Sequence, residues 1–253
     1  MYFALTVIGS CAVLYVALPL LVRAYLRRRF IRHIAAADCA FLTFDDGPDP
    51  SVTPKLLALL SRYDVKATFF VIGEKAERHP ELIAMLIANG HEVAEHSYRH
   101  LHPWKAGPVT AAQDLRNGSA VLDALGLRDD GRLLRPPYGK LNVGSLVYLM
   151  FKRAATAYWT IDPQDFRRTS GVEVADLVCR HLRKGEVVLL HDGCGRNEDG
   201  TGIPVVLSAV ERILEVARER RLTWSVLHRA ARSFDVRAPA ADGSSNRCGR
   251  LAP

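Results

Sequence analysis

The chain has 253 residues, of which 49% are hydrophobic and 24% charged, enough to bury a full core in one barrel-sized domain or two smaller ones. Its formal net charge is +7, but no stretch interleaves basic with aromatic residues, so we expect no nucleic acid partner. Its five cysteines are scattered and lack C-x-x-C spacing, which argues against a cysteine zinc site and a disulfide framework.

The first segment, from Tyr2 to Val22, carries no charge over about 21 residues, long enough to cross a hydrocarbon core of roughly 30 Å as a helix. A signal peptide would show a basic start and a small-residue cleavage site, and neither is clear. We therefore expect residues 1–35 to form one transmembrane helix with a basic juxtamembrane segment. The basic residues that follow the apolar stretch are Arg23, Arg27, Arg28, Arg29 and Arg32.

The same arginines predict an orientation. By the positive-inside rule, they place the rest of the chain on the cytoplasmic side of the inner membrane. An anchored protein that faces outward is the alternative.

Residues 36–232 alternate short apolar runs with helical patterns, which is typical of parallel strands joined by helices. About seven units favour a distorted (β/α) barrel over an open sheet. The strands are expected at 41–44, 67–72, 92–94, 133–135, 156–160, 187–190 and 223–227, and helices at 53–63, 80–90, 172–185 and 204–221. Residues 233–253 lose this periodicity and are predicted to be a mobile tail.

Polar residues stand where these expected strands end. Parallel strands bring their carboxyl ends to one face of an α/β domain, so a single site could hold them all. The residues are Asp45 and Asp46 after the first strand, His96 and His100 after the third, Arg135 at the fourth, Asp162 and Asp165 after the fifth, and His191 at the sixth.

A metal site is one interpretation of this set. His96 and His100 are four residues apart and would share a face of a helical turn, and Asp46 could add a carboxylate oxygen. A solvated helix face is the alternative. We favour the metal because His91 and His102 also lie near the end of this strand.

The neighbouring residues suggest proton transfer. Beside a bound cation, Asp45 could act as general base on metal-bound water, and His191 as general acid toward a leaving amine. Arg135 and the carboxylates of "IDPQDF" would then orient these two groups. Each residue also has a simpler reading, as a turn, a core histidine or an ion pair.

Five stretches in this order resemble the motifs of polysaccharide deacetylases, the NodB homology domain of carbohydrate esterase family four. The stretches are "TFDDGP", "HSYRH", "RPPYG", "DPQDF" and "LLH". The resemblance covers about residues 39 to 227, so 36–232 would be the catalytic domain. It implies metal-dependent hydrolysis of an N-acetyl group on an amino sugar.

The resemblance also implies roles for single residues. Asp45 would be the base and His191 the acid, with Arg135 holding Asp45 and Asp165 tuning His191. Asp46, His96 and His100 would bind zinc or a similar divalent ion. Pro137, Tyr138 and Phe166 would contact substrate, and the backbone N–H of Tyr138 would help to stabilise the oxyanion.

Two positions depart from the family pattern. Phe166 stands where the family usually has tryptophan, and Glu95 where asparagine is common. The first affects substrate fit. The second places an acid beside the expected metal, where it would alter histidine basicity or metal preference.

Other functions stay open on the sequence alone. They are a carbohydrate-binding or assembly protein without turnover, and a deformylase of an amino sugar. The substrate would be a glycan or, if the chain faces the cytoplasm, a lipid-linked saccharide.

Overall fold

A computed structural model describes residues 2–127, 132–152, 154–193 and 204–227, with side chains from residue 15 onward. The expected mobile tail, residues 233–253, lies outside the described residues. So do residues 194–203, which follow the sixth strand.

Seven parallel strands form one sheet in the order β5-β4-β3-β2-β1-β6, with β7 paired to β1. A further bridge joins Ile161 to Val188, so the chain that leaves β5 crosses to β6 and the sheet curves into a half-barrel. The seven predicted strands are confirmed. Their bounds are β1 Ala40–Asp45, β2 Thr68–Val71, β3 Glu92–Glu95, β4 Leu133–Leu134, β5 Ala155–Thr156, β6 Val187–His191 and β7 Trp224–Ser225.

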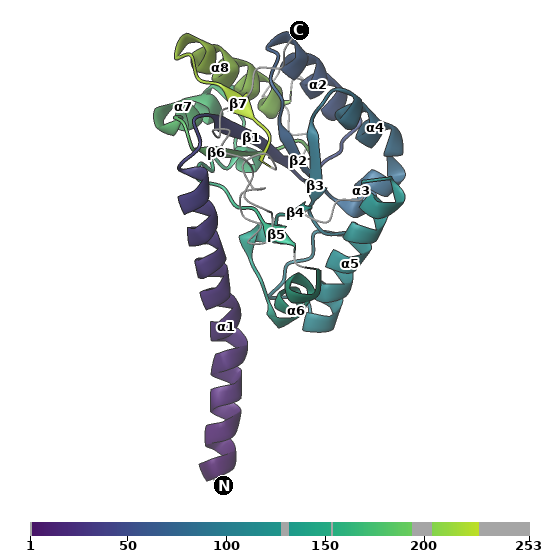
Figure 1. Ribbon diagram of the computed structural model, residues 1–253, viewed down its shortest axis with the longest axis vertical. Helices are drawn as coiled ribbons and strands as arrows, with labels where there is room; N and C mark the ends of the chain where they lie inside the picture. Colours follow the sequence, from purple (N-terminus) through teal and green to yellow (C-terminus); the bar gives the residue numbers. More distant parts are fainter. Residues whose placement is uncertain (1, 128–131, 153, 194–203, 228–253) are drawn as a thin grey trace, which may run out of the picture.

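Helices cover the outside of this sheet (Figure 1). The four predicted helices are present, and α3, α5 and α6 were not predicted. The helices after the first are α2 Thr53–Arg62, α3 Gly73–Arg78, α4 Pro80–Ala88, α5 Pro108–Ala124, α6 Val143–Lys152, α7 Gly171–His181 and α8 Val205–Glu219, with short 3-10 turns η1 Pro137–Gly139 and η2 Asp165–Arg167.

Alternation along β1 shows how the strands serve two cores. Leu42 and Phe44 point outward, where they pack with residues of the covering helices. Phe41 belongs instead to a second cluster, together with Phe70 of β2 and Val187 of β6. Residues at odd positions of β1 therefore face the inside of the half-barrel, and this face ends at Asp45.

The helix α1, Tyr2–Ile34, runs away from the domain toward the N-terminus (Figure 1). Its last turns join the inner core, because Phe30 and Ile34 are buried among the inner-facing residues. Within the part of the chain that the structure describes, no helix is long and apolar enough to cross a membrane. The expected transmembrane helix is therefore not supported. The helix itself is present, but it continues through the arginines and ends as part of the core.

Cys39, just before β1, is disulfide-bonded. The sequence did not predict this bond, because the spacing of cysteines along the chain does not report their distance in the fold.

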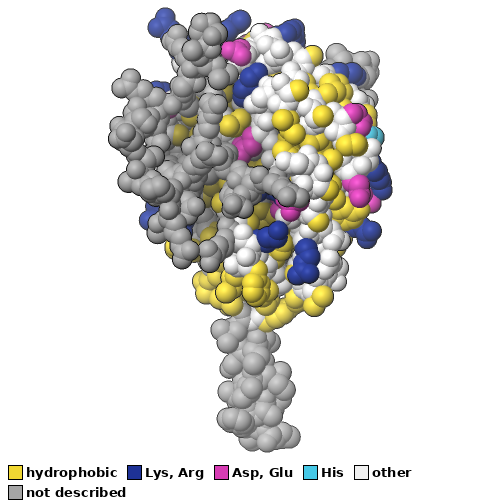
Figure 2. Space-filling model, turned by 45° about the vertical axis from the view of Figure 1, so that its right-hand side comes forward, with side chains coloured by type: hydrophobic (Ala, Val, Ile, Leu, Met, Phe, Trp, Pro, Cys, Tyr) yellow, Lys and Arg dark blue, Asp and Glu magenta, His cyan; other side chains and the backbone are white. Residues whose placement is uncertain are grey.

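Hydrophobic side chains gather at the lower end of the domain, where α6 lies (Figure 2). The exposed apolar residues of α6 are Val147, Met150 and Phe151.

The contact between α5 and the loop after β3 depends on a glycine. A Cβ at Gly118 would lie 2.6 Å from the carbonyl carbon of Ser97, closer than real Cβ contacts. The loop is tied to the same helix, because the Tyr98 N–H donates to the Asp114 carbonyl at 3.1 Å and the Arg99 N–H donates to the Asp114 carboxylate at 3.0 Å.

We predict that Gly118→Ala lowers the free energy of unfolding by about 1 to 3 kcal/mol, because backbone on both sides of the contact must shift. Chemical denaturation followed by circular dichroism would measure the change. Gly107→Ala is the matched control, since a Cβ there meets only the Thr110 hydroxyl oxygen at 4.0 Å. Equal stability of both variants would contradict the prediction.

Candidate functional site

The carboxyl ends of β1, β3, β4 and β6 bring the predicted polar residues to one place. The strand register pairs Asp45 directly with His191. The Arg135 N–H donates to the Glu95 carbonyl at 2.9 Å, which places Arg135 beside the end of β3. The carboxyl end of the sheet therefore holds residues from four separate parts of the sequence.

Asp46, His96 and His100 form a cluster whose ligand atoms lie within 4.8 Å of one another. The Asp46 Oδ1 is 3.5 Å from Nε2 of each histidine, which is too long for a hydrogen bond. Two donors about 2.1 Å from one tetrahedral ion lie about 3.4 Å apart, so this spacing fits a shared cation. The same Oδ1 is buried and has no hydrogen-bond partner among the described residues.

His96 is oriented for such a role by its other nitrogen. Its Nδ1 lies 2.7 Å from the Arg135 carbonyl, which accepts only a hydrogen bond, so Nδ1 carries the proton and Nε2 is free to bind. Burial, aided by the neighbouring His100, lowers the pKa of His96 to about 3. The imidazole is therefore neutral, as a metal ligand must be.

The two histidines do not share a helical turn. Residues 96–100 form a loop, and Ser97 and His100 have positive φ angles of 64° and 56°. The loop folds back on itself because the His100 N–H donates to the Ser97 hydroxyl at 3.0 Å. The histidines thus meet, with ring centres 4.8 Å apart, but the helical geometry expected from their spacing is wrong.

His91 does not belong to this group. It precedes β3, at the opposite end of the strand from His96, and its Nδ1 accepts the Ala67 N–H at 3.1 Å. His91 is a buried core histidine that packs against Phe69. His102, by contrast, lies near the cluster, with its ring 4.7 Å from that of Tyr138.

Asp45 is paired with Arg135 inside the half-barrel. The guanidinium donates to Asp45 Oδ1 at 2.6 Å and to the Thr43 hydroxyl at 2.9 Å, and its centre lies 4.0 Å from the centre of the Phe70 ring. Burial raises the pKa of Asp45, while the charges of Arg135 and His191 oppose the rise. Asp45 is therefore a carboxylate held in place and made more basic than one in water.

His191 is held by a second carboxylate, Asp165. Its Nδ1 lies 2.7 Å from Asp165 Oδ1, and its backbone N–H donates to Oδ2 at 2.8 Å. Burial alone would lower the pKa of His191, but the hydrogen bond and charge of Asp165, with Asp45 and Asp46, raise it to about 9. The imidazole is thus protonated near neutral pH.

Of the other residues in the "DPQDF" stretch, Phe166 lies at the site and Asp162 lies at the surface. Phe166 lies edge-on to the His191 ring, with ring centres 5.1 Å apart. Asp162 is exposed and accepts the Gln164 N–H at 2.9 Å, so the structure does not bring it to the site.

The "RPPYG" stretch places Tyr138 at the solvent-exposed side of the cluster. Its ring lies 4.6 Å from that of His100 and is 49% exposed. Pro137 is buried, so it shapes the turn η1 rather than presenting a surface.

Glu95 faces away from the cluster. It is the last residue of β3 and His96 follows it directly, so the two side chains point to opposite faces of the sheet. Its carboxylate accepts from the Tyr148 hydroxyl at 3.3 and 3.4 Å, and burial raises its pKa to about 8. The expectation that Glu95 adds an acid close to the metal is therefore wrong.

Sequence reasoning missed a group behind Asp46. The Lys75 ammonium donates to the backbone carbonyls of Asp46 at 2.7 Å and Gly193 at 3.0 Å. The Thr53 hydroxyl donates to the buried Asp192 carboxylate at 2.8 Å, and the Asp192 N–H donates to the Asp45 carbonyl at 3.1 Å. Of these residues, only Asp192 stands directly beside a predicted site residue in the sequence, because it follows His191.

These contacts clamp the loops after β1 and β6 together. A Cβ at Gly193 would lie 1.9 Å from the Asp46 carbonyl oxygen, so only glycine allows this approach. The group therefore fixes the backbone that carries Asp46.

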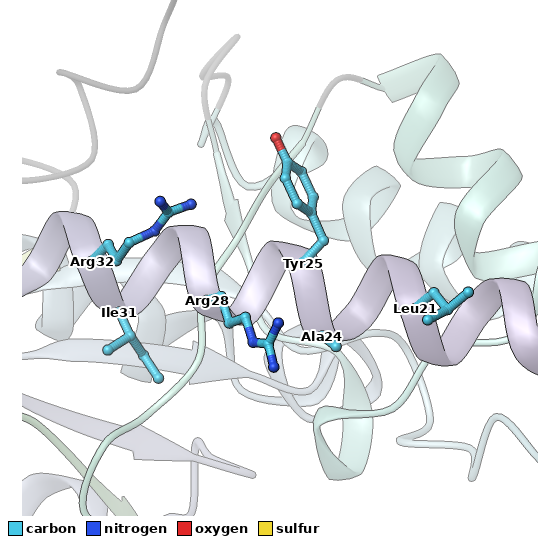
Figure 3. Close-up of a pocket in the computed structure, with 6 residues that line it drawn as sticks. All are labelled: Leu21, Ala24, Tyr25, Arg28, Ile31 and Arg32. Atoms are coloured by element: carbon cyan, nitrogen blue, oxygen red, sulfur yellow. The ribbon is translucent and has the colours of Figure 1, made fainter.

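A separate pocket lies along α1 (Figure 3). It is lined by Leu21, Ala24, Tyr25, Arg28, Ile31 and Arg32. None of these residues belongs to the polar cluster, so we assign the pocket no part in its chemistry.

Comparison with known proteins agrees with the motifs. Residues 34–150 match the family model described as polysaccharide deacetylase. The chain is 32% identical over 188 residues to a chitooligosaccharide deacetylase of Sinorhizobium fredii, covering 73% of this chain and 87% of the relative. It is 34% identical over 156 residues to a peptidoglycan-N-acetylglucosamine deacetylase of Bacillus cereus, covering 60% of this chain and 71% of the relative.

Solved structures show the same fold. A family 4 carbohydrate esterase from Streptomyces lividans, in complex with acetate, superposes with a TM-score of 0.64 at 29% identity, covering 75% of this chain and 93% of the other. A CE4-family pseudoenzyme from Bacillus anthracis gives 0.66 at 21% identity, covering 77% and 65%. From the family model and the length of the alignment with the relatives, we conclude that the chain belongs to the polysaccharide deacetylase family.

Proposed function

We propose that the protein hydrolyses the N-acetyl amide of an amino sugar, in a glycan or a lipid-linked saccharide. The observation that supports this best is the pairing of two differently tuned groups across one cluster: a basic Asp45 and a protonated His191. An amide needs both, because water must lose a proton as it attacks and the amine must gain one as it leaves.

The cluster of Asp46, His96 and His100 would hold the divalent ion, and we propose zinc. One carboxylate and two imidazoles are a set that zinc accepts in catalytic sites, and the orphaned oxygen of Asp46 fits this role. When bound, the ion supplies a Lewis acid for the amide carbonyl and lowers the pKa of water.

Asp45 would take the proton from the attacking water. Arg135 holds the Oδ1 of this carboxylate at 2.6 Å, which leaves Oδ2, 3.6 Å from the His96 Nε2, on the cluster side. The base is therefore fixed where water would attack the acetyl carbon.

His191 would give a proton to the amide nitrogen as the C–N bond breaks, releasing acetate and a free amine. Asp165 holds Nδ1, so the proton to be donated is on Nε2. The backbone N–H of Tyr138 is proposed to donate to the developing oxyanion, and Phe166, against His191, to contact the sugar.

Two alternatives share the fold and are separated by experiment. A deformylase would release formate from an N-formyl sugar through the same groups. A carbohydrate-binding protein without turnover would bind metal and sugar but release neither acid.

The first test is acetate release from N-acetylglucosamine oligomers, measured enzymatically. We expect Asp45→Asn to lower kcat by about 10²- to 10⁴-fold, because an amide cannot take the proton from water. Asp162→Asn is the matched control, since this carboxylate bonds only the backbone of Gln164 among the described residues, and it should keep wild-type activity. No acetate from the metal-bound protein would overturn the proposal, and release of formate from an N-formyl sugar under the same conditions would then identify a deformylase.

The second test is metal affinity, measured by titrating the metal-free protein with zinc. We expect Asp46→Asn to weaken binding by about 100-fold or more, because it removes an anionic ligand. Glu95→Gln should bind zinc as the wild type does, because the Glu95 carboxylate faces Tyr148. A large loss of affinity in Glu95→Gln would contradict the geometry given above.

The third test is the pH dependence of kcat/KM. His191 must be protonated to donate, so activity falls as pH rises through its pKa, raised in the wild type to about 9. Asp165→Asn removes the charge that favours the imidazolium, so the alkaline limb should move to lower pH. Asp162→Asn should leave the limb in place. If the alkaline limb of Asp165→Asn stayed at the wild-type pH, that limb would belong to a group other than His191.

A further inference from the structure

A row of aromatic rings leads from His100, in the candidate metal site, to the protein surface at Trp104. The Tyr138 ring lies between two histidines, 4.6 Å from His100 and 4.7 Å from His102. His102 in turn lies 6.2 Å from Trp104, and the Lys140 ammonium sits 4.7 Å from the centre of the Trp104 ring. We call His102, Trp104 and Lys140 the ledge.

The ledge is exposed and yet fixed in place. Trp104 is 57% exposed, but its Nε1–H donates to the Leu141 carbonyl at 3.2 Å. The Asn142 side-chain amide donates to the Pro103 carbonyl at 2.7 Å, which ties the loop before Trp104 to the chain after Lys140. An exposed, rigid aromatic ring beside a polar site is a surface on which the apolar face of a sugar ring can stack.

The hydrogen bonding of the ledge lacks an acceptor. The Trp104 backbone N–H donates to His102 Nδ1 at 3.2 Å, and the Lys140 ammonium lies 3.2 Å from Nε2. Because Nδ1 accepts, a neutral imidazole carries its proton on Nε2, so this N–H faces the ammonium, which is another donor. An oxyanion placed between these two groups would accept from both.

The charge around the ledge is positive. Lys105, one residue after Trp104, is exposed, and neither Lys105 nor Lys140 forms an ion pair with a carboxylate among the described residues. A neutral sugar would need no such pair of cations. An anionic group on the sugar would be attracted by both.

We propose that the ledge is a second subsite, which binds the sugar next to the one that is deacetylated and selects a sugar that carries a carboxylate or phosphate. Trp104 would stack on the ring, and Lys140 with His102 would bind the anion. This inference rests on the proposed function for the place of the first sugar, and it names the substrate class: an amino-sugar chain with an acidic substituent.

The experiment measures binding, so that it does not depend on turnover. The affinity of the Asp45→Asn protein, loaded with zinc, is determined by calorimetry for three probes: a neutral N-acetylglucosamine oligomer, an oligomer of equal length with alternating lactyl carboxylates, and an N-acetylglucosamine disaccharide with a terminal diphosphate. Tight binding of the second or the third probe identifies the source of the anion.

Two variants are then added to this background. Trp104→Ala should weaken binding of all three probes by about fivefold to tenfold, the loss expected for one stacked ring. Lys140→Gln should weaken binding of the preferred acidic probe about tenfold and that of the neutral oligomer less than twofold. Lys184→Gln, an exposed lysine before β6, is the matched control and should change nothing.

The inference would be overturned if the Asp45→Asn protein bound all three probes with equal affinity. It would also be overturned if Lys140→Gln lowered the affinity for the neutral and the acidic probes by the same factor. Failure of the proposed function gives a different result. In that case the wild-type protein releases no acetate, whatever the binding experiment shows.

Discussion

The guanidinium of Arg135 is fully buried, and a buried charge is tolerated only where a partner and hydrogen bonds replace water. Here Asp45, the Thr43 hydroxyl and the Tyr158 carbonyl serve that purpose. The backbone of the same residue binds the Nδ1 of His96. One residue therefore fixes both the proposed base and a proposed metal ligand, and losing its side chain would leave Asp45 as an unpaired buried charge.

The sheet explains why these groups converge. Phe41, Thr43 and Asp45 alternate along β1 to the inside of the half-barrel, so the apolar inner core passes into the polar site along one strand. The site thus has a floor of packed apolar side chains and an open mouth at Tyr138. Such a floor keeps water away from the ion pair, which strengthens it, while substrate can still reach the cluster.

The sequence predicted the seven strands and the convergence of polar residues at the strand ends, because apolar runs and polar strand ends both follow from local pattern. It did not predict which face of the sheet, or which end of a strand, each side chain occupies. Glu95 and His91 looked like neighbours of the cluster, yet strand alternation turns Glu95 to the outer face, and His91 lies at the other end of β3. Lys75 gave no signal, because it acts on backbone carbonyls, which every residue possesses.

The loops around the site show why spacing alone could not give its geometry. Asp46, Ser97, His100, Tyr138 and Gln164 all have positive φ, between 55° and 70°, and each lies in a loop that follows a strand. For residues with a Cβ this conformation costs about 1 to 2 kcal/mol each, so no local preference selects it. It must be imposed by long-range contacts: Lys75 on the Asp46 carbonyl, and α5 on the loop that carries Ser97 and His100. The histidines therefore meet through a strained loop rather than a helical turn. The order of side chains in the sequence predicts the candidate ligands, but it does not predict the backbone conformation that orients them.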